Sequence, residues 1–179
     1  MQIAEGVHVF ERPQRDRGFD LPSRSTALEL GDGAVALVSP IDWSLVLEPE
    51  KAEEELRALG EVRYLIAPNL LHHLHLETAL ERFPGAQILG PRGLEKKRPA
   101  LGGRYLALEE IRSSERTSDL RAALEWIPLE GAPSIREWAI LHLQSRSLVL
   151  TDLVFHIREP RGFLTGLLLR MGGTYGKLA

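Results

Sequence analysis

The stretch VRYLIAPNLLHHLHLE, residues 62–77, joins an expected strand to a cluster of polar side chains. Its first part, Val62 to Ala67, is an apolar run of the kind that forms a buried strand. Three of the six histidines of the chain and one carboxylate follow within residues 72–77. Because ligands collect at the carboxyl ends of strands in α/β sheets, the stretch predicts a binding or metal site.

The segments around this stretch predict helices that alternate with strands. Residues 49–59 have apolar positions at helical spacing, a proline near the start and Gly60 after the end, which predicts a helix. A second helix is expected over Leu76–Phe83 and a short strand over Ala86–Leu89. This alternation indicates an α/β sheet in the middle of the chain.

Both ends of the chain predict antiparallel hairpins. The expected strands are Val7–Phe10, Ser25–Leu30 and Ala34–Val38 in the first third, and Ala122–Ile127, Glu137–Leu143 and Ser147–Thr151 later. A Gly-Asp-Gly turn at residues 31–33 joins one pair. The stretch ERPQRDRGFDLPSR, residues 11–24, and the region 101–118 are expected to be loops. We therefore expect a single domain over residues 1–179, with a mixed sheet or two sheets and helices outside.

Composition narrows the classes of partner. The chain has 179 residues, 44% of them hydrophobic, and a formal net charge of -3 from 22 basic and 25 acidic residues. No basic face points to nucleic acid, and no apolar run reaches the roughly 20 residues that span a membrane. Because there are no cysteines, a metal must be held by His, Asp or Glu. With no signal peptide evident, we expect a soluble cytoplasmic protein whose partner is a small-molecule ligand or substrate.

The candidate metal ligands come from two segments. In extended geometry His73, His75 and Glu77 point to one side of the chain, so the two imidazoles can reach one ion. A stable site needs a third ligand from another segment. Asp152 ends the apolar strand that begins at Ser147, and His156 follows four residues later. Asp152 is therefore the expected third ligand.

Each of these residues also has a simpler interpretation. Asp152 could cap a turn or a helix, as carboxylates at strand ends often do. His72 lies on the side opposite the pair, which favours a hydrogen-bonded structural role over ligation. His8 and His142 lie within expected strands and are interpreted as core or surface residues.

These residues resemble a known superfamily. HLHLE at 73–77 resembles the His-X-His-X-Asp-His signature of the metallo-β-lactamase fold, and LVLTDLVF at 148–155 resembles its later strand that ends in a metal-bridging Asp. Three further segments, VALVSPID at 35–42, IAPNLLHHL at 66–74 and FPGAQILGPRGLEKK at 83–97, look like a branch of that superfamily known as a domain of unknown function.

The resemblance implies an αββα sandwich of two mixed β-sheets with outer helices, shortened at the C-terminus. It also implies metal-dependent hydrolysis, in which one or two zinc or iron ions activate water. Carried over by position, His73 and His75 bind the first metal, Asp152 bridges, and Glu77 stands where an Asp ligates metal or orients water.

The sequence departs from the signature at several positions. Thr78 stands where the signature has its last histidine, and Gly131 stands where the Gly-His-X-Pro-Gly segment has its histidine. Glu130, His72 and His156 are the available substitutes. A set of two histidines and one carboxylate can hold one zinc or iron ion, and the same set can be a relic without metal.

Two functions follow as hypotheses. The first is a metal-dependent hydrolase with an incomplete site, in which Glu77 and Asp152 take part in catalysis. The alternative is a non-catalytic descendant of the fold that binds a small ligand or a partner. In addition, the apolar stripe Phe163, Leu164, Leu167, Leu168 and Met171 in the tail predicts a helix that covers its own core or a second copy of the chain in a homodimer.

Overall fold

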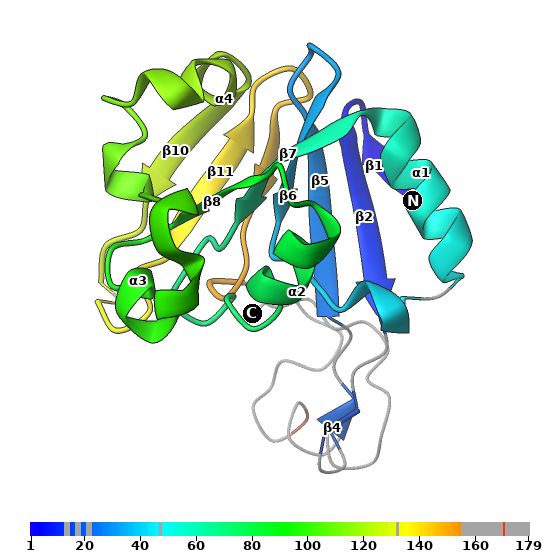
Figure 1. Cartoon of the computed structure of the whole chain (residues 1–179), viewed down its shortest axis with the longest axis horizontal. Coiled ribbons are helices and arrows are strands. Elements are labelled where there is room, and N and C mark those ends of the chain that lie inside the picture. Colours follow the sequence, from blue (N-terminus) through cyan, green and yellow to red (C-terminus); the bar gives the residue numbers. More distant parts are fainter. Residues whose placement is uncertain are drawn as a thin grey trace.

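A computed structural model describes residues 1–12, 15–16, 19–20, 23–46, 48–131, 133–154 and 170. Its elements form two sheets that face each other (Figure 1). The large sheet has the strand order β1-β2-β5-β6-β7-β8-β9, and the small sheet the order β10-β11-β12. The strands of the large sheet are β1 (Gln2–Ala4), β2 (Val7–Arg12), β5 (Ser23–Glu29), β6 (Ala34–Val38), β7 (Glu61–Ile66), β8 (Gln87–Gly90) and β9 (Tyr105–Ala107).

The large sheet is antiparallel in its first part and parallel in its second. Strands β1, β2, β5 and β6 pair antiparallel, whereas β6, β7, β8 and β9 pair parallel. The helix α1 (Pro49–Leu59) connects β6 to β7, and α2 (Leu76–Arg82) connects β7 to β8, as parallel strands require. The expected helices, the hairpin at residues 31–33 and the mixed sheet are therefore confirmed.

The small sheet is antiparallel throughout. It consists of β10 (Leu124–Pro128), β11 (Trp138–His142) and β12 (Ser147–Val149), and β11 and β12 form the expected hairpin. The strand expected from Ala122 was placed too early, because residues 118–123 form the helix α4. Apolar Leu120 lies in the helix α4 and apolar Leu124 in the strand β10, so the apolar pattern alone does not mark the boundary between the two elements.

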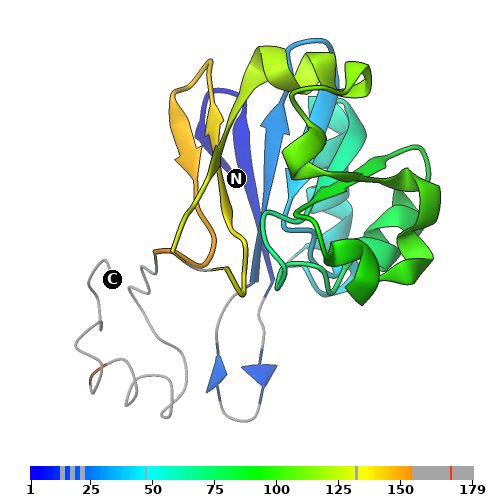
Figure 2. The same ribbon diagram turned by 90° about the vertical axis from the view of Figure 1, so that its left-hand side faces the viewer.

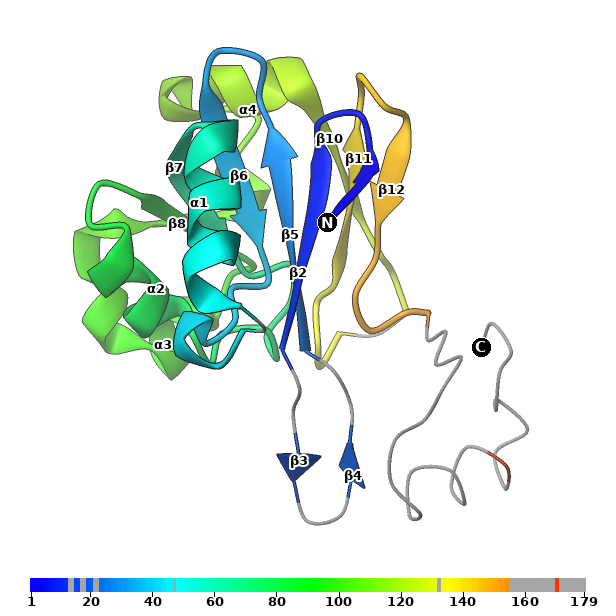
Figure 3. The ribbon, with the colours of Figure 1, turned by 90° about the vertical axis from the view of Figure 1, so that its right-hand side faces the viewer.

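Two regions that we expected to be loops contain short strands. Residues 11–24 include the end of β2, the start of β5 and the small hairpin of β3 (Arg15–Asp16) and β4 (Phe19–Asp20), which extends away from the two sheets (Figure 3). The region 101–118 includes β9, which lies at the edge of the large sheet between the 3-10 helices η2 (Pro99–Arg104) and η3 (Leu108–Glu110). A further 3-10 helix, η4 (Glu115–Thr117), comes just before α4. These strands have two or three residues, too few to show a hydrophobic period.

The core has two layers, one on each face of the large sheet. All five residues of β6 are buried, and their side chains alternate between the layers. Val35 and Leu37 pack with residues of α1, α2 and the helix α3 (Leu94–Lys97), whereas Ala36 and Val38 pack with residues of α4 and the small sheet. Figures 2 and 3 show α1, α2 and α3 on one side of the large sheet and β10–β12 on the other.

The outer face of the small sheet carries apolar side chains that stay accessible. Ile127 is 37% exposed and Leu148 is 51% exposed. The tail stripe from Phe163 to Met171 lies outside the described residues, so the expected tail helix and homodimer stay predictions. No helix among the described ranges is long and apolar enough to cross a membrane.

A glycine at the start of β7 generates the first prediction. Gly60 has a positive φ of 139°, and a Cβ there would lie 2.1 Å from the backbone oxygen of Gly33. We expect Gly60→Ala to lower the free energy of unfolding by about 2 kcal/mol or more, because the methyl group clashes with main chain that cannot rotate away. Urea unfolding followed by circular dichroism measures the change.

Gly85→Ala is the matched control. A Cβ at Gly85 meets nothing within 4 Å, so this variant should unfold at nearly the parental urea concentration. Equal midpoints for the two variants would contradict the packing described for Gly60.

Candidate active site

The candidate site lies where loops from both sheets meet at one end of the sandwich. Ser39 directly follows β6, Asn69 and His72 lie in the loop after β7, and Asp152 lies after β12. Two backbone hydrogen bonds join the loop after β7 to the segment before and at the start of β11: Leu70 N donates to Ile135 O at 2.8 Å, and Trp138 N donates to Pro68 O at 2.9 Å. The carboxyl ends of parallel strands thus form one wall, as in other α/β sites.

Three side chains of this site lie in a row of close polar contacts. Ser39 Oγ lies 2.6 Å from His72 Nδ1, and His72 Nε2 lies 3.3 Å from Asp152 Oδ2. The His72 side chain is 29% exposed and that of Asp152 is 23% exposed, so a small molecule can reach both. The hydrogen bonds agree with the expected structural role of His72, although its partners are the candidate Asp152 and an unexpected serine.

Asn69 holds both ends of the His72–Asp152 contact. It is fully buried, and its Nδ2 donates to Asp152 Oδ2 at 2.7 Å and to Thr151 Oγ1 at 3.2 Å. Its Oδ1 accepts from the backbone N–H of Leu71 and of His72, at 2.8 and 3.1 Å. Because this amide satisfies groups on two loops, it fixes the imidazole relative to the carboxylate.

Glu137 holds the loop that carries Asp152. Its side chain is buried, and its Oε1 accepts from Thr151 N, Thr151 Oγ1 and Asp152 N, each at 3.0 Å. The backbone N–H of Leu153 lies at 3.4 Å from the same oxygen. A buried carboxylate is stable when several N–H and O–H groups surround it, so Glu137 and this loop hold each other in place.

Electrostatics keep Asp152 ionised. The hydrogen bond from His72 lowers the pKa of Asp152 below the usual value of an aspartate, and the bond from Asn69 acts in the same direction. Burial opposes this shift, because it disfavours the charged form. The site therefore presents a carboxylate that accepts a hydrogen from the imidazole.

The predicted metal ligand His73 faces a different group. Arg98 Nε donates to His73 Nδ1 at 2.9 Å, and Arg98 Nη1 lies 3.5 Å from Glu77 Oε1. Burial lowers the pKa of His73, and the positive charges of Arg98 and Lys97 lower it further. In the neutral imidazole the second nitrogen then carries the proton, so neither nitrogen offers a lone pair to a metal.

The predicted ligand His75 lies in a third environment. The charges of Arg12 and Asp42 both act on its pKa, which burial and Arg12 lower and Asp42 raises. Arg12 Nη1 and Asp42 Oδ2 are 3.8 Å apart. Residues 72–75 form turns and α2 starts at Leu76, so the extended geometry that was expected to align His73, His75 and Glu77 is wrong. His73 and Glu77 still meet through Arg98, so their proximity comes from the turn and the helix and not from a strand.

The donor set does not fit a bound metal ion in this arrangement. Across the described part of the chain, no three His, Asp or Glu side chains lie close enough together to hold one ion. Of the substitutes, Glu130 is exposed in a turn, His72 has Ser39 and Asp152 as partners, and His156 lies outside the described residues. The zinc or iron ion and its ligands His73, His75 and Asp152 stay a prediction, and we derive no chemical step through them.

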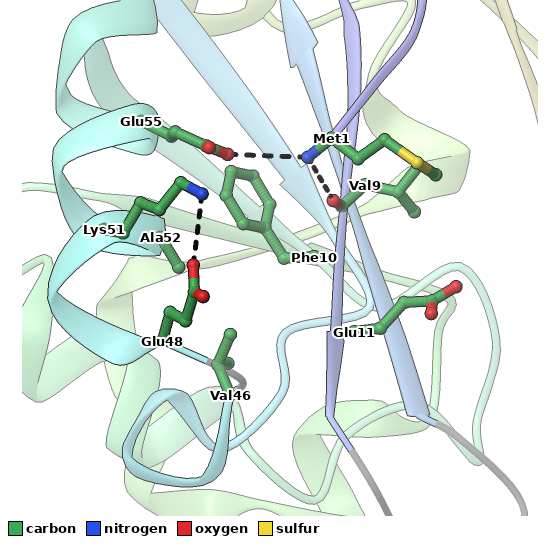
Figure 4. Close-up of a pocket in the computed structure, with 9 residues that line it drawn as sticks. All are labelled: Met1, Val9, Phe10, Glu11, Val46, Glu48, Lys51, Ala52 and Glu55. Carbon is green, nitrogen blue, oxygen red and sulfur yellow. Dashed lines mark hydrogen bonds and ion pairs between the residues drawn. The ribbon is translucent and has the colours of Figure 1, made fainter.

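A separate pocket lies on the outer side of β2. Figure 4 shows it between β2 and α1, with Phe10 and Ala52 at its floor and charged groups at its rim. Lys51 pairs with Glu48 at 3.1 Å, and the amino group of Met1 lies 3.5 Å from Glu55. No side chain of the candidate site lines this pocket, and the remaining charge, that of Glu11, is paired with Arg24 outside it.

Comparison with known proteins supports the fold. No family model matches the chain, and no curated protein sequence matches it. A solved structure that is similar is fragment 1–254 of diflavin flavoprotein A 5 from Nostoc sp. PCC 7120, with a TM-score of 0.59 and 16% sequence identity. The match covers 83% of this chain and 63% of that chain, so this chain spans less than two thirds of its neighbour.

The N-terminal domain of that flavoprotein is metallo-β-lactamase-like, so this chain has a metallo-β-lactamase-like fold, as the sequence predicted. Its described part has a seven-stranded mixed sheet, a three-stranded antiparallel sheet and helices. The expectation of two mixed sheets was wrong for the small sheet, whose strands are joined by short connections and pair antiparallel. At 16% identity the likeness shows the arrangement of the elements and leaves the chemistry to the residues of this chain.

The site residues that sequence reasoning missed are Ser39, Asn69 and Glu137. Ser39 and Asn69 each follow an apolar strand within three residues, which is the same signal that singled out Asp152. Glu137 precedes β11, and in an antiparallel sheet the start of one strand lies beside the end of the next. That signal was available only once the pairing of β11 with β12 was known.

Glu137 generates the second prediction. We expect Glu137→Gln to lower the free energy of unfolding by about 2 kcal/mol, because it replaces charge-assisted hydrogen bonds and points an NH₂ group at backbone donors. Chemical denaturation measures this. Glu125→Gln, at an exposed position of β10, is the control and should stay within about 0.5 kcal/mol of the parent. Equal effects of the two variants would show that Glu137 does not hold the loop.

Proposed function

We propose that the chain is a hydrolase that acts on a small molecule at the Ser39–His72–Asp152 site, with His72 as the general base. The observation that carries the proposal is the contact of 3.3 Å between His72 Nε2 and Asp152 Oδ2. An imidazole that a carboxylate orients is arranged to accept a proton from a nucleophile at its other nitrogen. Asp152 is a positioning residue in this scheme.

The hydrogen bonds around the His72–Asp152 contact favour a preorganised site. Asn69 binds the carboxylate of Asp152 and the backbone of His72, and Glu137 binds the backbone of Asp152. Catalytic groups work best when the surrounding structure fixes them before the substrate arrives. The buried Asn69 and Glu137 supply that support from both sheets.

The proposal differs from the metal-dependent hydrolysis that the resemblance implies. In that version His73, His75 and Asp152 hold a zinc or iron ion, and Glu77 orients the attacking water. The Arg98 guanidinium that donates to His73 and pairs with Glu77 makes these two side chains poor partners for a second cation. The described geometry therefore supports proton transfer by His72 better than activation of water by a metal.

The second candidate function is binding of a small molecule without turnover. Arg12 favours it, because its side chain is 10% exposed and its Nε has no hydrogen-bond partner among the described residues. A largely buried guanidinium with an unpaired Nε–H group is suited to a carboxylate or phosphate group of a ligand.

An esterase assay tests the proposal. We expect protein dialysed against EDTA to hydrolyse a small activated ester such as p-nitrophenyl acetate, with saturation. His72→Ala should lower kcat/KM about 100-fold or more, because the general base is lost. His8→Ala is the matched control, because it removes another partly buried histidine. His8 pairs with Glu29 at 3.0 Å, at the end of β5 that lies away from the candidate site, so this variant should leave kcat/KM unchanged.

Metal analysis of protein purified without a chelator separates the alternatives. If zinc copurifies, is lost in a His73→Ala/His75→Ala double variant and is required for turnover, then the metal-dependent version is correct and the proposal fails. Binding of small carboxylates or phosphates with no turnover of any ester would favour the second candidate.

A further inference from the structure

The two ring nitrogens of His72 contact groups from two different loops. Nε2 faces Asp152 in the loop after β12, and Nδ1 faces Ser39 in the loop after β6. His72 itself comes from the loop after β7. A serine, a histidine and an aspartate that are far apart in sequence are therefore linked in that order by contacts of 2.6 and 3.3 Å.

The chemistry of the partners fixes which nitrogen carries the proton. An ionised carboxylate only accepts hydrogen bonds, so the nitrogen that faces Asp152 bears the hydrogen. In the neutral imidazole the other nitrogen then has a free lone pair, which accepts the hydroxyl hydrogen of Ser39. The opposite tautomer would point a lone pair at the carboxylate. Ser39 thus donates to the base that can remove its proton.

The backbone at Ser39 is unusual for a serine that only fills space. Ser39 has a φ of 52°, in the left-handed region that side chains with a Cβ seldom adopt, directly after the buried strand β6. Such a conformation costs about 1–3 kcal/mol and persists where the surroundings hold it. Here Ser39 N donates to Ile66 O at 2.8 Å. A strained turn after a strand is also how the nucleophilic serine of other hydrolases is presented.

Access to the hydroxyl limits the substrate. Ser39 is 6% exposed, whereas the His72 and Asp152 side chains are 29% and 23% exposed. A substrate must therefore approach from the side of His72 and Asp152 and bring its carbonyl carbon to a hydroxyl that is largely covered. Esters or thioesters of short acyl chains meet this requirement, and bulky acyl groups do not.

We propose that Ser39 is the nucleophile of a Ser39–His72–Asp152 triad that cleaves short-chain esters or thioesters through a covalent acyl-enzyme. The inference rests on the proposed function and adds the nucleophile and the substrate class. Ser39 Oγ forms a bond to the carbonyl carbon while its proton moves to His72 Nδ1. The bond from that carbon to the leaving oxygen or sulfur then breaks, and His72 returns the proton to the leaving group.

Water completes the cycle without any further reactant. His72 takes a proton from a water molecule as the water oxygen attacks the acyl carbon, and the bond from the carbon to Ser39 Oγ breaks. The proton returns to Oγ, so that the acid is released and the serine is restored. Asp152 stays ionised and stabilises the imidazolium that forms in each step.

Covalent labelling tests the inference directly. Methanesulfonyl fluoride is a small reagent that transfers its sulfonyl group to an activated serine and releases fluoride. We expect one adduct for each chain, located at Ser39 by peptide mass spectrometry. We also expect a burst of product, equal to one acyl group for each chain, when p-nitrophenyl acetate is added to a high concentration of protein.

Matched variants separate an activated serine from a structural one. Ser39→Ala should give no adduct, whereas Ser25→Ala should give the parental rate, because Ser25 is an equally buried serine that donates to Val38 O at 2.9 Å. His72→Ala and His72→Gln should label about 100-fold more slowly, and His72→Gln covers the case in which the alanine variant does not fold. Circular dichroism checks the fold of every variant.

The outcomes distinguish this inference from the proposed function. Ester turnover with no adduct at Ser39 and no burst would overturn the triad and leave a His72-dependent hydrolase. An adduct at Ser39 with no ester turnover would keep the activated serine and overturn the proposed hydrolase. Labelling of Ser39 at the parental rate in both His72 variants would show that the histidine does not activate it, which also overturns the triad.

Discussion

The requirement to bury both faces of the large sheet determines the rest of the structure. Strand β6 is buried along its whole length, so its alternate side chains need an apolar layer on each face. The helices α1, α2 and α3 supply one layer, and the small sheet with α4 supplies the other. Burial of this kind stabilises the domain because apolar area is removed from water on both sides of one sheet. It also brings the loops after β6, β7 and β12 to one end of the sandwich.

At that end, buried polar groups from the two sheets form hydrogen bonds with each other. Asn69 and Glu137 are buried, and their side chains tie the loop after β7 and the segment before β11 to Asp152 and its neighbours. Buried polar groups without partners are costly, so such a network has one favourable arrangement. The rigidity that holds the core together therefore also fixes His72 between Ser39 and Asp152.

The same fold can carry different chemistry, because the chemistry depends on a few side chains at its edge. The resemblance to metallo-β-lactamases led to an expectation of metal at His73 and His75. Instead, Arg98 donates a hydrogen bond to His73, and His75 lies within reach of the charges of Arg12 and Asp42. One residue earlier, His72 has the two neighbours of a general base. In the proposed function, a difference of one position within a turn decides which histidine acts.

The sequence by itself determined the mixed sheet, the helix at residues 49–59 and both hairpins, and it singled out Asp152 as a candidate site residue, because periods of apolar residues, turn residues and strand ends are local signals. It could not determine the start of β10, the short strand β9 or the partners of His72. The strands β9 and β10 are set by pairing with β8 and β11. The partners of His72 depend on contacts between segments more than thirty residues apart in the chain: Ser39 meets His72 across 33 positions, and Asn69 meets Asp152 across 83. Only the tertiary structure decides such pairs, because closure of the two sheets selects which loop ends face each other.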